Sequence, residues 1–267
     1  EIPGSLVGSE MCIRDSLFGL LREEMPPKDA CNRLSEELGR GDCEYLEYDR
    51  LITNKAIEWI RKQKKREKPD SPWVLFVSFV SPHYPLIAPP DFYDLYNDAN
   101  LPYDNYQNLS KNKLHSWVKG IRESWPYDDY MDEEKRKIAV QAYYGMCSFM
   151  DSNVGKLLTE LKQCDIYDDT TIIYASDHGE SLGNRGLWGK MTMYEDSASI
   201  PLIIKGPNFK KNRMCKTPVT LIDLYPTIFD ILSLDHVASE ANIDGESLRA
   251  IANKTYDKNR CVLSEYH

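Results

Sequence analysis

The sequence predicts an α/β protein in which helices cover both faces of a mixed, mainly parallel sheet. Short apolar runs bounded by Pro, Gly or Ser are typical of buried strands, and longer segments with apolar residues every three or four positions are typical of helices. The two kinds of segment alternate along the 267 residues, which favours a sheet with helical connections. Because 42% of the residues are apolar, the chain can bury one large core.

The first predicted elements are a helix over Tyr45–Lys62 and a strand over Trp73–Val80. Apolar residues recur at helical spacing in the first segment. The second, WVLFVSFV, is rich in β-branched and aromatic residues and lies between two Ser-Pro dipeptides, so we expect a buried strand that ends at a sharp loop. Residues 86–131 are dense in Pro, Tyr, Asn and Asp and show little periodicity, which predicts a long surface excursion.

A long helix is predicted over Asp132–Lys162, because its apolar residues form one face and acidic residues occupy its start. Two further buried strands, Thr170–Ser176 and Ile200–Gly206, are separated by a Gly-rich loop, and a helix over Leu221–Leu232 follows them. In open α/β sheets, ligands gather at the carboxyl ends of strands. Two of the predicted strands end in polar motifs, and these are the candidate site.

The composition argues against several classes of partner. The net charge of −9 repels the phosphates of nucleic acids and anionic lipid surfaces, so we expect no nucleic-acid partner. The longest apolar run, Trp73–Val80, is far shorter than the roughly 20 residues of a membrane span, so we expect no transmembrane helix. The seven cysteines form no CxxC pair and no zinc-binding pattern.

The motif SDHGESLG places Asp177 and His178 where a strand ends and Gly179 opens a turn. A carboxylate and an imidazole side by side suit a divalent cation, and glycines permit a close approach of the backbone to a ligand. The same pattern also fits a turn that Asp177 caps, with His178 hydrogen-bonded locally. The motif alone leaves both interpretations open.

Lys190 and His83 are two further candidates. Lys190 lies in a Gly-rich loop, where its ammonium group could bind an oxygen of a sulfate or phosphate, although most lysines are solvated surface residues. His83 lies between two prolines after the predicted strand and could protonate a leaving oxygen, although a lone histidine is more often structural.

Together these motifs resemble those of the sulfatases of the alkaline phosphatase superfamily, in the branch with choline-sulfatase-like and phosphonate monoester hydrolase-like enzymes. FVSPHYPL resembles the family's Pro-His-x-Pro segment, YYGMCSFMDSNVGKLLTEL its long helix, YDDTTIIYASDHGESLG its metal loop and GLWGKMTMYEDSASIPLI its lysine loop. TPVTLIDLYPTIFDIL, DGESLRAI and RCVLSEYH are similar to a later helix, a closing segment and a strand. The resemblance runs from about Tyr45 to the end and implies an alkaline-phosphatase-like α/β/α sandwich.

The resemblance also implies roles for the candidate residues in the hydrolysis of small-molecule sulfate monoesters. Asp177 and His178 would be ligands of one divalent cation, Lys190 would bind a sulfate oxygen, and His83 would bind the sulfate or protonate the leaving group. Calcium is the expected cation; because His178 stands where asparagine is commoner in the family, manganese or zinc remains open. The family's nucleophile is a formylglycine made from the cysteine of a Cys-x-Pro-Ser-Arg type motif.

The sequence departs from the family pattern at its start. None of its cysteines begins a Cys-x-Pro-x-Arg run. Leu6–Ser16 resembles the translation of a sequencing adapter, so we expect residues 1–16 to be foreign and residues 17–267 to be a partial sulfatase catalytic domain, incomplete at its N-terminus. Such a fragment is expected to be inactive by itself.

Two alternatives remain open at this stage. The Asp-His pair and the lysine loop would serve a phosphonate or phosphate ester hydrolase of the same superfamily equally well, since both substrates are tetrahedral anions. The chain could instead be a non-catalytic sulfatase-like protein that keeps the fold without the chemistry, an interpretation that the missing nucleophile motif supports.

Overall fold

A computed structural model describes most of the chain. The residues predicted to be foreign, 1–16, lie outside the described ranges, which are 27–64, 72–102, 114–234, 244–254 and 256–264.

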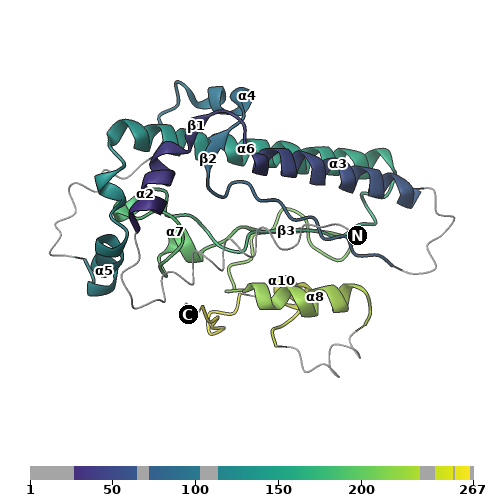
Figure 1. Cartoon of the computed structure of the whole chain (residues 1–267). Coiled ribbons are helices and arrows are strands. Elements are labelled where there is room, and N and C mark those ends of the chain that lie inside the picture. The colour runs from purple at the N-terminus through teal and green to yellow at the C-terminus, as the bar shows by residue number, and fades with distance from the viewer. Residues whose placement is uncertain (1–26, 65–71, 103–113, 235–243, 255, 265–267) are drawn as a thin grey trace.

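Three layers make up the fold (Figure 1). The long helices α3 (Glu44–Lys64) and α6 (Glu133–Gln163) form the upper layer, and α8 (Leu224–Ile231) and α10 (Leu248–Asn253) form the lower one. Extended chain around β3 (Ile172–Ala175) runs between them. This arrangement confirms the predicted α/β class with helices on both sides of the strands.

The two long helices confirm the predictions for Tyr45–Lys62 and Asp132–Lys162. Asp132 caps α6, because its side chain accepts a hydrogen bond from the backbone N–H of Lys135 at 2.8 Å. Acidic residues in the first turn and a lysine in the last turn of α6 also complement its dipole. The helices pack side by side, and Arg61 of α3 forms a bidentate ion pair with Glu160 of α6 at 2.9 Å.

A short parallel sheet lies against α6. Its strands are β1 (Leu38–Arg40) and β2 (Leu86–Ala88), with Leu38 opposite Leu86, and α2 (Pro27–Glu36) leads into β1. The sequence analysis predicted neither α2 nor β1, and the three residues of β1 are too few to show alternation. The prediction that a surface excursion begins at residue 86 is also wrong. Leu86 and Ala88 are buried, with exposed fractions of 2% and 0%.

The rest of that excursion contains short helices instead of structureless chain. They are α4 (Pro90–Tyr93), the 3-10 helix η1 (Asp94–Tyr96), α5 (Ser116–Ser124) and the 3-10 helix η4 (Tyr127–Asp129), while residues 103–113 lie outside the described ranges. The helices α4, η1 and η4 have only three or four residues each, too few for apolar periodicity to reveal.

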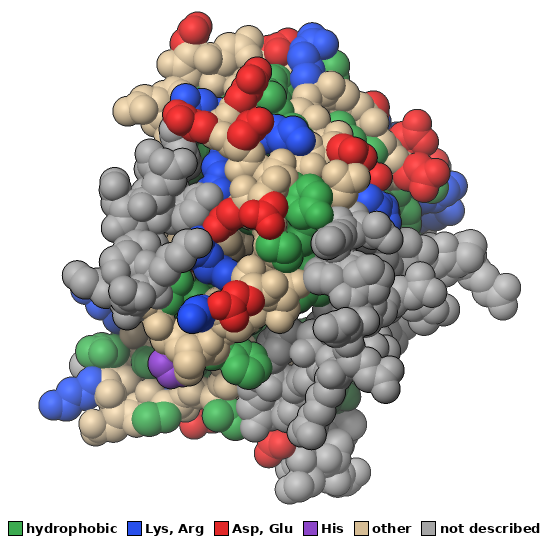
Figure 2. All heavy atoms as spheres, turned by 60° about the vertical axis from the view of Figure 1, so that its left-hand side comes forward, with side chains coloured by type: hydrophobic (Ala, Val, Ile, Leu, Met, Phe, Trp, Pro, Cys, Tyr) green, Lys and Arg blue, Asp and Glu red, His purple; other side chains and the backbone are tan. Residues whose placement is uncertain are grey.

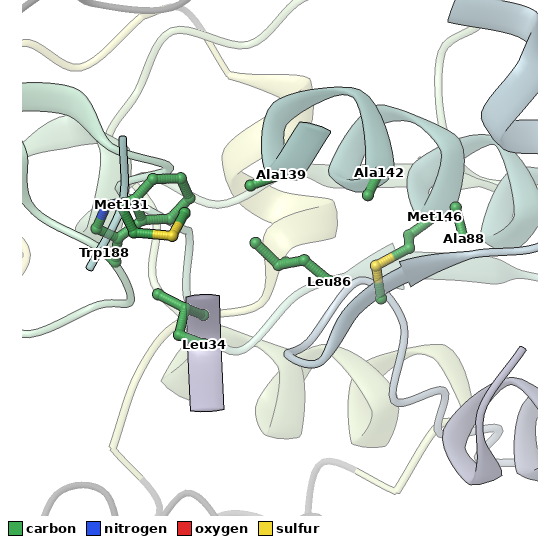
Figure 3. Close-up of a cluster of buried hydrophobic side chains, with 8 residues drawn as sticks. All are labelled: Leu34, Leu86, Ala88, Met131, Ala139, Ala142, Met146 and Trp188. Carbon is green, nitrogen blue, oxygen red and sulfur yellow. The ribbon is translucent and has the colours of Figure 1, made fainter. Parts of the chain in front are cut away.

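The core joins α6 to both the parallel sheet and a loop of the candidate site. A Cβ added to Gly145 of α6 would lie 2.8 Å from the Cβ of Ala88, so helix and strand are in close contact here. Trp188 lies beside Met131 in the same cluster and is 2% exposed (Figure 3). The cluster consists of Leu34, Leu86, Ala88, Met131, Ala139, Ala142, Met146 and Trp188.

A second pair of strands is antiparallel. β3 pairs with β4 (Leu202–Lys205), with Ile172 opposite Lys205 and Ala175 opposite Leu202. Both strands lie within the predicted segments Thr170–Ser176 and Ile200–Gly206. Their residues are half-buried or exposed, not fully buried as expected. Among the described residues the sheets are therefore one parallel and one antiparallel pair.

Trp73–Val80 is extended but is not assigned as a strand, and the prediction of a buried strand is wrong. Its side chains alternate between two faces. Leu75 packs with the buried cluster of Ile60, Leu161 and Cys164, whereas Phe76 is 87% exposed. A strand requires a hydrogen-bonded neighbour, and the described residues supply none for this segment.

The C-terminal part forms the lower layer. The 3-10 helix η6 (Leu221–Asp223) and α8 confirm the predicted helix over Leu221–Leu232. Ser247 caps α10 within the DGESLRAI segment. The strand expected in RCVLSEYH is absent from residues 260–264, and residues 265–267 lie outside the described ranges.

The surface carries both charged and apolar side chains. Figure 2 shows acidic and basic side chains interspersed over the upper part of one face, and apolar ones on its lower part. Met214 and Leu263 are 83% and 72% exposed. Of the helices in the described ranges, none has the length and apolar composition needed to cross a membrane.

We expect thiol labelling to separate buried from exposed cysteines. Burial, with the charge of Asp129, raises the pKa of Cys31 to about 12, and burial raises that of Cys147 to about 11. Since the thiolate is the reactive form, iodoacetamide at pH 8 should modify Cys31 and Cys147 at least about tenfold more slowly than the exposed Cys215 and Cys261. Peptide mass spectrometry measures the rates. Equal rates in the folded protein would contradict the packing of α2 and α6, and labelling in urea is the control.

Candidate active site

The four side chains predicted for the site lie in two loops that meet beyond the end of β3. Asp177 and His178 follow β3, and Lys190 lies further along the same loop. The Lys190 Nζ is 3.2 Å from the Nε2 of His83, which comes from the loop after the extended segment 72–80. The ring centroids of His83 and His178 are 6.4 Å apart, edge to face. The fold therefore brings together side chains that are far apart in sequence.

A backbone carbonyl orients the ring of His178. Its Nδ1 lies 2.8 Å from the carbonyl oxygen of Gly179, and since a carbonyl only accepts, Nδ1 carries the proton. Its Nε2 then has a lone pair and lies 3.6 Å from the Oδ2 of Asp177. A second-sphere carbonyl that fixes the tautomer in this way is typical of metal-ligating histidines.

The pair of donor atoms fits one divalent cation. Two atoms 3.6 Å apart can both lie 2.0–2.5 Å from the same ion. The side chain of Asp177 is 72% exposed, and its Oδ1 also accepts from the backbone N–H of His178 at 3.0 Å. Within the described ranges, no cluster of three or more His, Cys, Asp or Glu side chains could hold a metal. Asp177 and His178 could thus supply two ligands of a shell that needs others.

His83 is oriented by its own loop. Its Nδ1 lies 2.7 Å from the carbonyl oxygen of Tyr84, so Nδ1 is protonated and Nε2 accepts from Lys190. In this arrangement His83 holds no proton on the nitrogen that faces the site. The predicted role as a proton donor therefore requires that Nε2 first gain a proton, and the ammonium group of Lys190 is in hydrogen-bond contact with it.

Asp49 of α3, which the sequence analysis did not single out, holds the loop of His83 in place. It is 0% exposed, and its two carboxylate oxygens accept from the backbone N–H groups of Val80 at 2.8 Å and Ser81 at 2.9 Å. Burial raises the pKa of Asp49, and the hydrogen bonds from Val80 and Ser81 oppose that rise. The carboxylate fixes the point at which the extended segment turns into the His83 loop.

We expect Asp49→Ala to destabilise the fold by about 2–4 kcal/mol, because it leaves two N–H groups without acceptors and opens a cavity. Asp49→Asn keeps one carbonyl acceptor and should cost about half as much. The measurement is urea denaturation, with the exposed Asp98→Ala as the control for loss of an acidic side chain. Equal free energies of unfolding for Asp49→Ala and Asp98→Ala would show that the hydrogen bonds of Asp49 to Val80 and Ser81 do not stabilise the fold.

The loop after β3 approaches α7 (Glu195–Ala198) closely at Gly179. The Gly179 N–H donates to the carbonyl oxygen of Ser197 at 2.8 Å. A Cβ at Gly179 would lie 2.1 Å from the carbonyl oxygen of Asp196, so only glycine fits. The buried Ser197 hydroxyl is also 3.2 Å from those of Ser181 and Thr192. This network fixes the loop directly after the Asp-His pair.

Between Gly179 and Lys190 the backbone is strained. Leu182 and Arg185 have φ angles of 47° and 58°, values that side chains other than glycine rarely adopt. Arg185 lies in the 3-10 helix η5 (Asn184–Gly186) and forms an ion pair with Asp196 at 2.5 Å. Such strain persists only where the surroundings impose it, and it concentrates at functional sites.

Comparison with known proteins identifies the family. The family model named Sulfatase matches residues 22–234, which include all four predicted site residues. The chain belongs to the sulfatase family. This sulfatase chain is 34% identical to the choline-sulfatase of Rhizobium meliloti (strain 1021) over 226 residues, which cover 83% of this chain and 43% of that protein. It is 30% identical to human arylsulfatase K, with 97% of this chain and 50% of that protein covered.

The chain is also similar to a solved structure from the predicted branch. The phosphonate monoester hydrolase of Silicibacter pomeroyi matches with a TM-score of 0.59 and 27% identity, over 76% of this chain and 42% of that one. The similarity to choline-sulfatase and to a phosphonate monoester hydrolase confirms the predicted branch. The sulfatase chain spans about half the length of the curated relatives that it matches.

Two residues that support the site escaped the sequence analysis. Asp49 lies within a predicted helix, and no local signal distinguishes a buried anchoring carboxylate from a surface one. Glu180 follows the Asp-His-Gly motif, and its Oε1 accepts from the backbone N–H groups of Leu182 and Gly189. Its position beside the motif was the only available signal.

Proposed function

We propose that this chain supplies part of the active site of a metal-dependent sulfuric ester hydrolase that acts on small-molecule sulfate monoesters. The observation that carries the proposal is the convergence of the Asp177–His178 pair with Lys190 and His83 at the end of β3. Membership of the sulfatase family and the names of its relatives support the same reaction.

Each side chain has a role that its chemistry permits. Asp177 and His178 would hold the cation through Oδ2 and Nε2; a bound divalent cation supplies Lewis-acid stabilisation of charge on the sulfate. Calcium is the expected ion, with manganese or zinc as alternatives. Lys190 would bind a sulfate oxygen through its ammonium group, which attracts any tetrahedral anion as a point charge.

His83 would act on the leaving group. In the structure its Nε2 accepts from Lys190, so binding of an anion to Lys190 would compete for the same ammonium group. Lys190 keeps its proton on the anion, and a proton from solvent could then reach Nε2 for donation to the leaving oxygen. No nucleophilic step is assigned to these residues, because the printed sequence contains no Cys-x-Pro-x-Arg motif from which formylglycine could form.

A phosphonate ester hydrolase is the second candidate, supported by the structural similarity to the Silicibacter pomeroyi enzyme. The two reactions share the geometry of a tetrahedral anion bound by a cation and a lysine. The curated relatives, a choline-sulfatase and arylsulfatase K, favour the sulfate ester.

The test is to express the complete open reading frame that contains these residues together with a formylglycine-generating enzyme. Hydrolysis of 4-nitrophenyl sulfate is compared with that of 4-nitrophenyl phenylphosphonate. Faster turnover of the sulfate supports the proposal, and faster turnover of the phosphonate supports the second candidate. A complete protein that turns over neither, and whose sequence lacks the nucleophile motif, would be a non-catalytic member of the family.

A further inference from the structure

The residue directly before Lys190 is held by the Asp-His loop through both of its backbone hydrogen-bonding groups. The Gly189 N–H donates to the Oε1 of Glu180 at 2.7 Å, and the Gly189 carbonyl oxygen accepts from the N–H of Ser181 at 2.8 Å. These two bonds join the segment after His178 to the segment that carries Lys190. The position of Lys190 relative to the proposed cation ligands therefore depends on residues 180 and 181.

Glu180 makes a second bond that fixes its own position. The same Oε1 accepts from the N–H of Leu182 at 2.8 Å, and Leu182 has one of the strained φ angles of this loop. A carboxylate oxygen that accepts from two N–H groups is a strong acceptor, because hydrogen bonds to a charged group exceed neutral ones in strength. One oxygen thus holds both the strained turn and the residue before Lys190.

The surroundings of Glu180 are also consistent with a fixed orientation. Burial, followed by the charges of Cys147 and Glu180, raises the pKa of Tyr143, a residue of α6. Glu180 is therefore close to the helix under the loop. Its Oε1 accepts from two backbone N–H groups, whereas the side chain of Asp177 is 72% exposed.

We propose that Glu180 is a positioning residue that sets the distance between the Lys190 ammonium group and the Asp177–His178 pair. It acts through the Gly189 N–H and touches neither the cation nor the substrate. This inference rests on the proposed function in one respect, that Lys190 binds a sulfate oxygen. Loss of Glu180 removes the acceptor of the Gly189 N–H and leaves this residue held by the bond from the Ser181 N–H, so that Lys190 leaves the position in which its Nζ lies 3.2 Å from His83.

The test uses three variants of the protein expressed from the complete open reading frame that contains these residues. Glu180→Ala removes the acceptor, and Glu180→Gln keeps a carbonyl oxygen in its place. Glu195→Ala, at an exposed residue of the neighbouring α7, removes one negative charge without touching either hydrogen bond and is the matched control. The first readout is hydrogen exchange of the Gly189 amide, and the second is the rate at which an acetylating reagent modifies Lys190.

We expect Glu180→Ala to speed exchange at Gly189 by about tenfold or more, since that amide loses its acceptor. Acetylation of Lys190 should accelerate in the same variant. Glu180→Gln should restore most of the wild-type behaviour, and Glu195→Ala should match the wild type. An unchanged exchange rate at Gly189 in Glu180→Ala would overturn the proposal. So would faster exchange at Gly189 with an unchanged acetylation rate of Lys190.

Inorganic sulfate separates the positioning role from the proposed function. If Lys190 binds sulfate, sulfate slows its acetylation in the wild type, and Glu180→Ala should need about tenfold more sulfate for the same protection. If sulfate gives no protection in the wild type, the role of Lys190 in the proposed function fails. The exchange and acetylation rates without sulfate still decide whether Glu180 positions Lys190.

Discussion

Replacing Lys190 by Ala in the complete, formylglycine-bearing enzyme should lower kcat/KM for 4-nitrophenyl sulfate by about 10²–10³. The reason is electrostatic. Removing one hydrogen-bond donor that is preorganised to stabilise charge in the transition state typically lowers the rate by a factor of this size. Asp177→Ala should cost at least as much, because it removes one of the two proposed cation ligands on this chain. The measurement is steady-state hydrolysis at a calcium or manganese concentration that just saturates the wild type.

Two comparisons make this prediction specific. Lys211 is an exposed lysine away from the loop, and Lys211→Ala should keep kcat/KM within about twofold of the wild type. Raising the concentration of the divalent cation should partly restore the Asp177→Ala variant but not the Lys190→Ala variant, since only the former loses affinity for the ion. Full activity of Lys190→Ala would remove this lysine from the mechanism.

The sequence predicted the parts of the fold that periodicity encodes. The helices around Tyr45–Lys62 and Asp132–Lys162 are long enough for an apolar face to repeat many times, and the structure contains both. Trp73–Val80 shows the limit of this reasoning. Its apolar run predicts a strand, but a strand also needs a partner, and partners are set by the rest of the sheet.

The candidate site could be proposed from the sequence where its chemistry is local. Asp177 and His178 are adjacent and follow a strand, so a pattern at one place in the chain made them candidates. The contact between His83 and Lys190 depends on how the loop after residues 72–80 meets the loop after β3, and no local pattern encodes it. Asp49 shows why supporting residues are missed, because its function is to accept backbone hydrogen bonds from a segment distant in sequence.

The Asp-His loop should tolerate no side chain at Gly179. We expect Gly179→Ala to lower the free energy of unfolding by about 3 kcal/mol or to abolish folding of the loop. A new Cβ would lie 2.1 Å from the Asp196 carbonyl oxygen, and backbone cannot rotate away as a flexible side chain can. Urea denaturation measures the loss, and amide exchange at Ser181 and Gly189 shows whether it is confined to the loop.

Gly155 provides the matched control for this substitution. It lies inside α6, and a Cβ there would meet no atom within 4 Å. Because alanine favours helix over glycine by about 0.5–1 kcal/mol, Gly155→Ala should stabilise the same protein by that amount. Changes of opposite sign in the free energy of unfolding would exclude the general effect of alanine on the unfolded chain. They would show that the contact with α7 requires glycine after Asp177 and His178. A Gly179→Ala protein as stable as the wild type would mean that the loop and α7 are not packed as described.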